Sequence, residues 1–333
     1  MEPVKTGFFA MDTLMEITVY GTDEVPPDGE QGKTEYGNRL SDGAQELVKS
    51  VEGALSVTDK DSEIFRLNSG QQVMLGETTR DILSKSLGLC GLTGGRLDIS
   101  IYPLVKLWGF TTGEYTVPAG DRIAAGLENV GYKAVSEAFA AYDGQEPFKL
   151  PEGMEIDLGA VAKGYTAELL KEYYTSNGVA SGLISLGGNV LAIGTKPDGS
   201  NWNIAIADPA GDGYAAILGI SDASLVTSGG YERYFEANGK RYSHIIDPAT
   251  GYPVDNGVLS VSVTGRDSMY CDALSTALFV MGEDEAEDFW RRNRDFEFVI
   301  INDEGKIIAS PGLKGILEPG ERYGKDAVSF IDP

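Results

Sequence analysis

A change of pattern near residue 150 limits most strongly how this chain can fold. Before it the chain reads mainly as helices, and after it short strand-like runs alternate with glycine, proline and asparagine turns. The runs with helical spacing or helical stop signals are 38–55, 77–93, 121–131, 159–178 and 268–282. The mixture favours an α+β fold with mixed sheets and packed helices, in one compact unit with two lobes.

Residues 14–21 alternate enough to predict a strand, and a polar loop rich in Gly, Pro and acids is expected over 21–38. A further strand is predicted over 182–194, with a glycine pair inside it. No fixed-period repeat, low-complexity tract or proline-rich linker divides the chain. We therefore expect a single domain over residues 1–333, with a C-terminal extension over 301–333.

The charge of the chain excludes one large class of partners. Among 333 residues, 51 are acidic and 27 basic, which gives a formal net charge of −24. Such a surface repels phosphodiester backbones and anionic lipid, so nucleic acid is not an expected partner. No apolar run reaches the roughly 18–20 residues that cross a bilayer. The opening MEPVKTGFFAMDT is neither a signal peptide nor a lipoprotein leader, an appearance that a removed leader would also leave.

The apolar run SMYCDALSTALFVMG contains the first candidate site. Asp272, Ser275 and Thr276 are spaced i, i+3, i+4, which puts their oxygens on one helical face. A carboxylate with hydroxyls, and no second thiol or histidine near Cys271, suits a hard cation such as Mg²⁺ or Ca²⁺. On this segment alone, an ordinary helix start whose polar groups satisfy the backbone is the commoner arrangement.

A second candidate is IDLGAVAKGY at 156–165. Asp157, Gly159 and Lys163 stand at the expected start of a helix, where they could hold a ribose hydroxyl and a phosphate. A helix cap followed by a solvated lysine is the simpler alternative. The glycine segments SLGGNV and TSGGYERY match neither a dinucleotide-binding nor a P-loop pattern, and such segments are most often only turns.

His244 is the only histidine, in the polar segment KRYSHIIDPATGYPV. A general base matched to neutral pH is the task that imidazole performs best, and Asp247 lies three residues away. A lone histidine is otherwise usually a surface or core residue without a special role. The pattern alone leaves both explanations open.

Taken together, eight segments in order resemble the ApbE family of FAD:protein FMN transferases. They are FFAMDT (8–13), DSEIFRLN (61–68), LDISIYPLVKLWGF (97–110), DLGAVAKGY (157–165), SLGGNV (185–190), TSGGYERYF (227–235), SHIIDPATGYPV (243–254) and CDALSTAL (271–278). The similarity covers roughly residues 7–300. Each segment is a weak signal, and their common order makes a specific one.

The resemblance implies an ApbE-like fold, related to the T-fold, and an enzyme that splits the pyrophosphate of FAD with Mg²⁺. It transfers FMN to a Thr or Ser hydroxyl of a flavoprotein and releases AMP. The implied catalytic residues are His244, as base, and Asp247. The implied FAD contacts are Met11, Leu97, Asp98, Ile99, Asp157, Lys163, Thr227, Ser228, Gly229 and Ile245, with Thr227–Gly229 expected as a glycine turn. The implied metal ligands are Ala160, through its carbonyl, Asp272 and Thr276, with Ser275 adjacent.

The resemblance also implies an acceptor with a Ser/Thr-Gly-Ala-Ser/Thr segment, and a lipid-anchored location on the outer face of a bacterial cell membrane. Thr58 replaces a common aromatic that covers the flavin, so stacking is expected from Tyr231 or Tyr252. Gly230 replaces a common polar residue. An FAD pyrophosphatase, with water as acceptor, and a non-catalytic FAD-binding protein are the alternatives.

Overall fold

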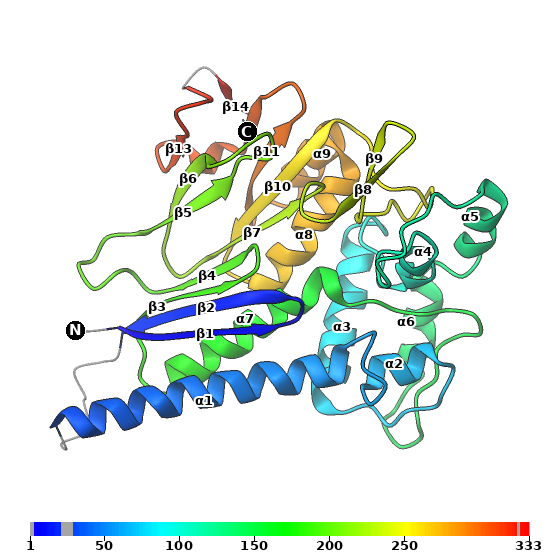
Figure 1. Ribbon diagram of the computed structural model, residues 1–333, viewed down its shortest axis with the longest axis horizontal. Coiled ribbons are helices and arrows are strands. Elements are labelled where there is room, and N and C mark those ends of the chain that lie inside the picture. Colours follow the sequence, from blue (N-terminus) through cyan, green and yellow to red (C-terminus); the bar gives the residue numbers. More distant parts are fainter. Residues whose placement is uncertain (1–2, 21–28, 325–326, 333) are drawn as a thin grey trace.

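The structure is a computed structural model that describes residues 3–20, 29–324 and 327–332, without the side chains of 29–34. A nine-stranded sheet forms its centre, in the order β1-β2-β3-β4-β7-β10-β11-β12-β14 (Figure 1). Neighbouring strands are antiparallel except β12 and β14, which are parallel. The strands are β1 (Val4–Ala10), β2 (Thr13–Tyr20), β3 (Ser181–Leu186), β4 (Asn189–Ile193), β7 (Ser224–Gly229), β10 (Val258–Gly265), β11 (Glu297–Asn302), β12 (Ile307–Ala309) and β14 (Val328–Phe330).

Two smaller sheets complete the β-structure. Strands β13 (Leu317–Pro319), β6 (Tyr214–Ile220) and β5 (Trp202–Ala207) form a three-stranded sheet, whose apolar side chains pack against those of the large sheet. Strands β8 (Tyr234–Ala237) and β9 (Lys240–Ser243) form a separate hairpin. Residues 301–333, expected as an extension, contribute β12 and β14 to the large sheet and β13 to the smaller one.

The helices divide into two groups (Figure 1). Helices α1 (Gly29–Leu55), α7 (Gly159–Ser176), α8 (Ser268–Met281) and α9 (Glu283–Arg292) lie along the large sheet and share its apolar cores. A second, helical lobe contains α2 (Glu63–Asn68), α3 (Glu77–Leu92), the 3-10 turn η1 (Ile99–Ile101), α4 (Tyr102–Leu107), α5 (Gly120–Leu127) and α6 (Tyr132–Ala140). Outside this lobe, a second 3-10 turn, η2 (Pro311–Leu313), follows β12. The α+β class and the two lobes expected from the sequence are therefore confirmed.

Helix α8 lies where these layers meet, and its sequence explains why. Nearly all of its residues are apolar or small, and most are fully buried between α7 and strands β7 and β10. A helix that is apolar on all sides has to be covered on all sides. Among the described residues, no helix is long and apolar enough to span a membrane.

Two expectations about local structure were wrong. The loop predicted over 21–38 is helical from Gly29 onward, while residues 21–28 lie outside the described part. Gly32 and Gly37 suggested a loop, but Gly37 packs against Val4, so tertiary contact outweighs their low helix propensity. The strand predicted over 182–194 is two strands, β3 and β4, joined by a turn at Gly187 and Gly188, which have φ of 55° and 84°.

Candidate functional site

Helices α7 and α8 cross at Gly164, which puts the carboxylate of Asp272 against α7. A Cβ on Gly164 would lie 2.4 Å from the carbonyl oxygen of Ser268, so only glycine allows this approach. The Gly164 N–H donates to Oδ2 of Asp272 at 2.7 Å. This contact joins two segments 108 residues apart. Asp272 and the start of α7, expected at one site, are therefore neighbours.

Hydroxyl groups gather beside Asp272. Ser275 Oγ donates to the Asp272 carbonyl at 2.8 Å. The Ser228 hydroxyl, from β7, lies 2.8 Å from Ser275 Oγ and 3.2 Å from Thr276 Oγ1. The end of β7 and one face of α8 thus present a continuous set of oxygen donors and acceptors next to a buried carboxylate.

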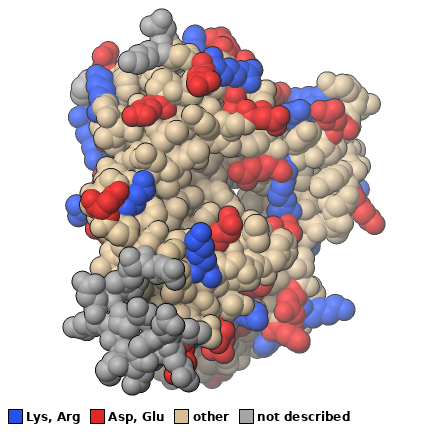
Figure 2. Space-filling model, turned by 60° about the vertical axis from the view of Figure 1, so that its left-hand side comes forward, with Lys and Arg blue, Asp and Glu red and all other residues tan. Residues whose placement is uncertain are grey.

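Lys163 supplies positive charge to this region. Burial raises the pKa values of Asp272, Asp157 and Glu232, and the charge of Lys163 opposes the rise in each case. Glu232 is solvent-exposed, yet desolvation still raises its pKa. Over one face of the molecule, acidic and basic side chains lie interspersed (Figure 2).

The imidazole of His244 is held by one backbone carbonyl. Both the His244 N–H, at 2.9 Å, and its Nδ1, at 3.1 Å, contact the carbonyl oxygen of Arg233. A carbonyl oxygen only accepts hydrogen bonds, so Nδ1 bears the proton and Nε2 keeps a free lone pair. Burial, together with the nearby charges of Arg233 and Lys163, lowers the pKa of His244 to about 4. The ring is therefore neutral at pH 7 and able to accept a proton.

Asp247 does not contact the imidazole, whose Nδ1 already has the Arg233 carbonyl as its partner. Its Oδ1 accepts from the Ala249 N–H at 2.9 Å, and its own N–H donates to the carbonyl of Tyr252 at 2.9 Å. These hydrogen bonds shape the turn that follows His244. Its catalytic role stays a prediction.

The predicted FAD contacts at 97–99 lie beside Asp157, because the Asp157 N–H donates to the Ile99 carbonyl at 2.7 Å. Leu97 and Ile99 are buried in the core of the helical lobe. Asp98 accepts from Ser100 with one carboxylate oxygen, and its other oxygen accepts from a backbone N–H at the start of α6. With both oxygens engaged, its carboxylate is a structural cap, so contact with a ligand through this segment would involve its backbone.

Two further predicted FAD contacts are Met11, in the turn between β1 and β2, and Ile245, in the segment after β9. Met11 and Asp12 form the turn between β1 and β2 with φ of 49° and 60°, a left-handed conformation that is uncommon outside glycine. The Met11 N–H donates to the carboxylate of Glu52 at 2.7 Å. Oδ2 of Asp12 lies 3.9 Å from Nη2 of Arg233. Ile245 is buried beside α8, directly after His244.

Thr227, Ser228 and Gly229 were expected as a turn and are instead the last residues of strand β7, paired with β10. The prediction was wrong because small residues at the end of a strand resemble a turn in sequence. Tyr231 packs its ring against Gly229, where a Cβ would lie 2.4 Å from Cε1. Tyr252 packs against Trp108, with ring centroids 5.8 Å apart. Which of the two rings faces a flavin stays a prediction.

Gly230 is closely packed beside a serine. An added Cβ would lie 3.3 Å from Phe279 and 3.4 Å from the Cβ of Ser243. The buried hydroxyl of Ser243 has no hydrogen-bond partner within the described residues. Gly230, which was expected to replace a common polar residue, therefore lies closely packed beside this hydroxyl.

The donor set at Asp272 fits Mg²⁺. Within the described ranges, no three His, Cys, Asp or Glu side chains gather as a metal cluster. Mg²⁺ commonly uses only one or two carboxylates, together with water and substrate phosphates. The carbonyl oxygen of Ala160 has two lone pairs, and the Gly164 N–H, four residues further along α7, donates to Asp272.

Glu232 and Arg233 lie within the glycine segment TSGGYERY and were not predicted as site residues from the sequence. The sequence signal that could have identified them is a pair of charged residues between two tyrosines. Asn68 was likewise quoted without a role, and its contact is 88 residues away in sequence.

The architecture is shared with solved flavin transferase structures. An ApbE protein from Thermotoga maritima superposes with a TM-score of 0.83 at 29% identity, covering 95% of this chain and 99% of that one. The flavin transferase ApbE from Vibrio cholerae gives a TM-score of 0.80 at 30% identity, covering 95% and 99%. The fold is therefore that of an ApbE-type flavin transferase.

Sequence comparison identifies the family. The sequence pattern of the ApbE family matches residues 11–300. An FAD:protein FMN transferase from Vibrio cholerae is 34% identical over 281 residues, 81% of this chain and 82% of the relative. One from Treponema pallidum is 33% identical over 282 residues, 80% and 78%. The chain belongs to the ApbE family.

Proposed function

We propose that this enzyme transfers the FMN part of FAD to a Thr or Ser hydroxyl of an acceptor flavoprotein and releases AMP. The convergence of charge at Lys163 is the main support. Lys163 directly precedes Gly164, whose N–H donates to Asp272, and its charge lowers the pKa values of Asp157, Asp272 and His244. Relatives named FAD:protein FMN transferases support the identity of the substrates.

Each of these residues has a separate role in the proposed reaction. Nε2 of His244 takes the proton of the acceptor hydroxyl, whose oxygen forms a bond to the phosphorus on the FMN side. The pyrophosphate bond breaks at that phosphorus, and its bridging oxygen leaves with AMP. Lys163 lies where it can offset the charge of the phosphates.

Mg²⁺ is part of this proposal. Asp272, Thr276 and the carbonyl of Ala160 would hold it, with Ser275 adjacent, and when bound it would neutralise phosphate charge. Asp157, with one oxygen engaged by the Gly159 N–H at 2.7 Å, would orient the substrate near the start of α7. Location on the outer face of a cell membrane through a lipid anchor stays a proposal drawn from the resemblance.

The test combines the purified protein, FAD and Mg²⁺ with a flavoprotein domain bearing a Ser/Thr-Gly-Ala-Ser/Thr segment, analysed by mass spectrometry. The expected result is an acceptor heavier by one FMN unit, with AMP released and both products abolished by EDTA. Free FMN and AMP with an unmodified acceptor would instead identify a pyrophosphatase. Intact FAD with several such acceptors would contradict both reactions and favour a binding protein.

A further inference from the structure

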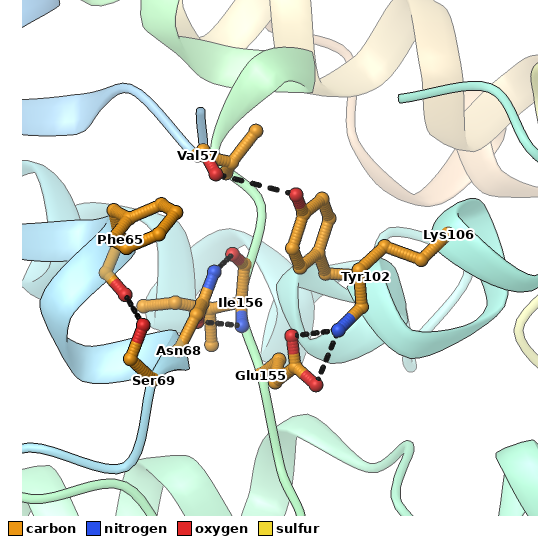
Figure 3. Close-up of polar contacts among 8 residues, drawn as sticks. All are labelled: Val57, Phe65, Asn68, Ser69, Tyr102, Lys106, Glu155 and Ile156. Atoms are coloured by element: carbon orange, nitrogen blue, oxygen red, sulfur yellow. Dashed lines mark hydrogen bonds and ion pairs between the residues drawn. The ribbon is translucent and has the colours of Figure 1, made fainter. Parts of the chain in front are cut away.

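Asn68, the last residue of α2, holds both backbone polar groups of Ile156 (Figure 3). Its Nδ2 donates to the Ile156 carbonyl at 2.8 Å, and its Oδ1 accepts from the Ile156 N–H at 2.8 Å. Residues 151–158 form neither helix nor strand, so their backbone groups need partners from outside a ladder. One side-chain amide here does what a neighbouring strand would do.

The residues on either side of Ile156 are fixed as well. The Glu155 carboxylate accepts from Lys106 of α4 at 2.7 Å (Figure 3). The Asp157 N–H donates to the carbonyl of Ile99 in η1 at 2.7 Å. Three elements of the helical lobe therefore hold three consecutive residues, and Asn68 holds the middle one from both sides.

What these contacts fix is the entry to α7. Asp157 follows Ile156 directly, and its Oδ1 accepts from the N–H of Gly159, the first residue of the helix. Lys163 lies one turn further, before Gly164 meets Asp272. The position of the C-terminal end of this segment, at Gly164, is thus fixed by α8. The position of its N-terminal end, at Asp157, depends on contacts with the helical lobe.

We propose that Asn68 is a positioning residue, which sets Asp157 and the first turn of α7 at the geometry that binds FAD. This role rests on the proposed function. Only a primary amide of this length can donate to the carbonyl and accept from the N–H of one residue. Aspartate has the same shape but no hydrogen-bond donor. One of its carboxylate oxygens would therefore face the carbonyl oxygen of Ile156, and both of these atoms only accept hydrogen bonds. Glutamine would add a methylene and move the contact.

The test uses Asn68→Asp in the full chain, with Asn293→Asp as the matched control. Asn293 also donates from Nδ2 to a backbone carbonyl, that of Phe289, at 2.9 Å, but at the end of α9. Amide hydrogen exchange over residues 155–163 is measured without flavin, and the Kd for FAD is measured by flavin fluorescence below the melting temperature of each variant. We expect faster exchange over 155–163 and about tenfold weaker FAD binding for Asn68→Asp, with neither change in the control.

Unchanged exchange over 155–163 would overturn the proposal. Faster exchange with an unaltered Kd for FAD would overturn it too, because the contact would then serve stability alone. If Asn68→Asp does not fold, Lys106→Met releases the neighbouring Glu155 and has to produce the same two changes in weaker form. A parent protein that does not bind FAD would contradict the proposed function, while the exchange data would still decide whether Asn68 fixes the start of α7.

Discussion

Gly164 of α7 and Asp272 of α8 are joined by a hydrogen bond of 2.7 Å from the glycine N–H to a buried carboxylate oxygen. The bond forms because the helices cross where one of them has no side chain. The same contact therefore sets the packing of the two helices and the place of the carboxylate, so stability and site geometry depend on one glycine.

Gly164→Ala is expected to destabilise the fold by about 1–3 kcal/mol, since the new methyl group meets the backbone of Ser268 and Met269 rather than a flexible side chain. Urea unfolding measures the free energy of unfolding. The matched control is Gly88→Ala in α3, where an added Cβ has nothing within 4 Å. That variant should be more stable by about 0.5–1 kcal/mol, from helix propensity alone. Equal effects of the two changes would contradict the crossing geometry.

Asp272→Asn should lower FMN transfer by about 10²–10³ and abolish its response to Mg²⁺, because it removes the one charge that would hold the cation. The amide oxygen can still accept from the Gly164 N–H, so the fold should persist. Steady-state rates over a magnesium titration test this. Asp267→Asn serves as the control, because Asp267 caps α8 through the Tyr270 N–H. A variant that keeps its magnesium response would remove Asp272 from the metal site.

His244→Gln should slow transfer by about 10²–10⁴ while FAD affinity stays near that of the parent. The pKa of His244 is lowered from its usual 6.5 to about 4, so the ring loses its proton-accepting form only as the pH falls toward 4. The transfer rate of the parent should therefore show no step due to histidine near pH 6.5, and should decline below about pH 5.

Two measurements check this assignment. A pH profile of transfer with a midpoint near 6.5 that disappears in His244→Gln would contradict the neutral, Nδ1-protonated ring. Stability gives an independent reading, because between pH 4 and 6.5 only the unfolded chain protonates this histidine. The stability of the parent should thus rise with pH through that window and level off above it, more steeply than that of the variant.

Ser243→Ala should leave stability unchanged or raise it by up to about 1 kcal/mol, since the buried hydroxyl of Ser243 has no partner within the described residues. The comparison is Ser310→Ala, whose equally buried hydroxyl accepts from the Phe298 N–H at 2.8 Å. That change should cost about 1–3 kcal/mol. Thermal unfolding of both variants decides the matter, and a large loss for Ser243→Ala would mean that its hydroxyl has a partner, such as a bound water.

Much of the fold could be predicted because its helices bury regular apolar stripes. The spacing within 159–178 and 268–282 was enough to place α7 and α8 within two residues of their ends. The hairpin of β3 and β4 could not be separated from one long strand, because both strands are apolar and the glycine pair between them fits a bulge as well as a turn.

The candidate site could be predicted only where residue type alone suggests chemistry, as at Asp272 and His244. The partner of the imidazole is a backbone carbonyl, which every residue has, so no letter in the sequence marks Arg233 for that role. Asn68 meets Ile156 only because the helical lobe folds around a shared apolar core, and that pairing has no local signature.

The attachment of His244 to the Arg233 carbonyl determines which part of the fold holds the ring. Arg233 stands at the base of the β8–β9 hairpin, a sheet of two strands apart from the larger ones. Both the backbone and the ring of His244 contact that base, whereas Lys163 and Asp272 lie on the pair of crossed helices. The proposed proton acceptor and the charged groups of the α7–α8 crossing are therefore held by different parts of the fold, which Ile245 joins by packing against α8.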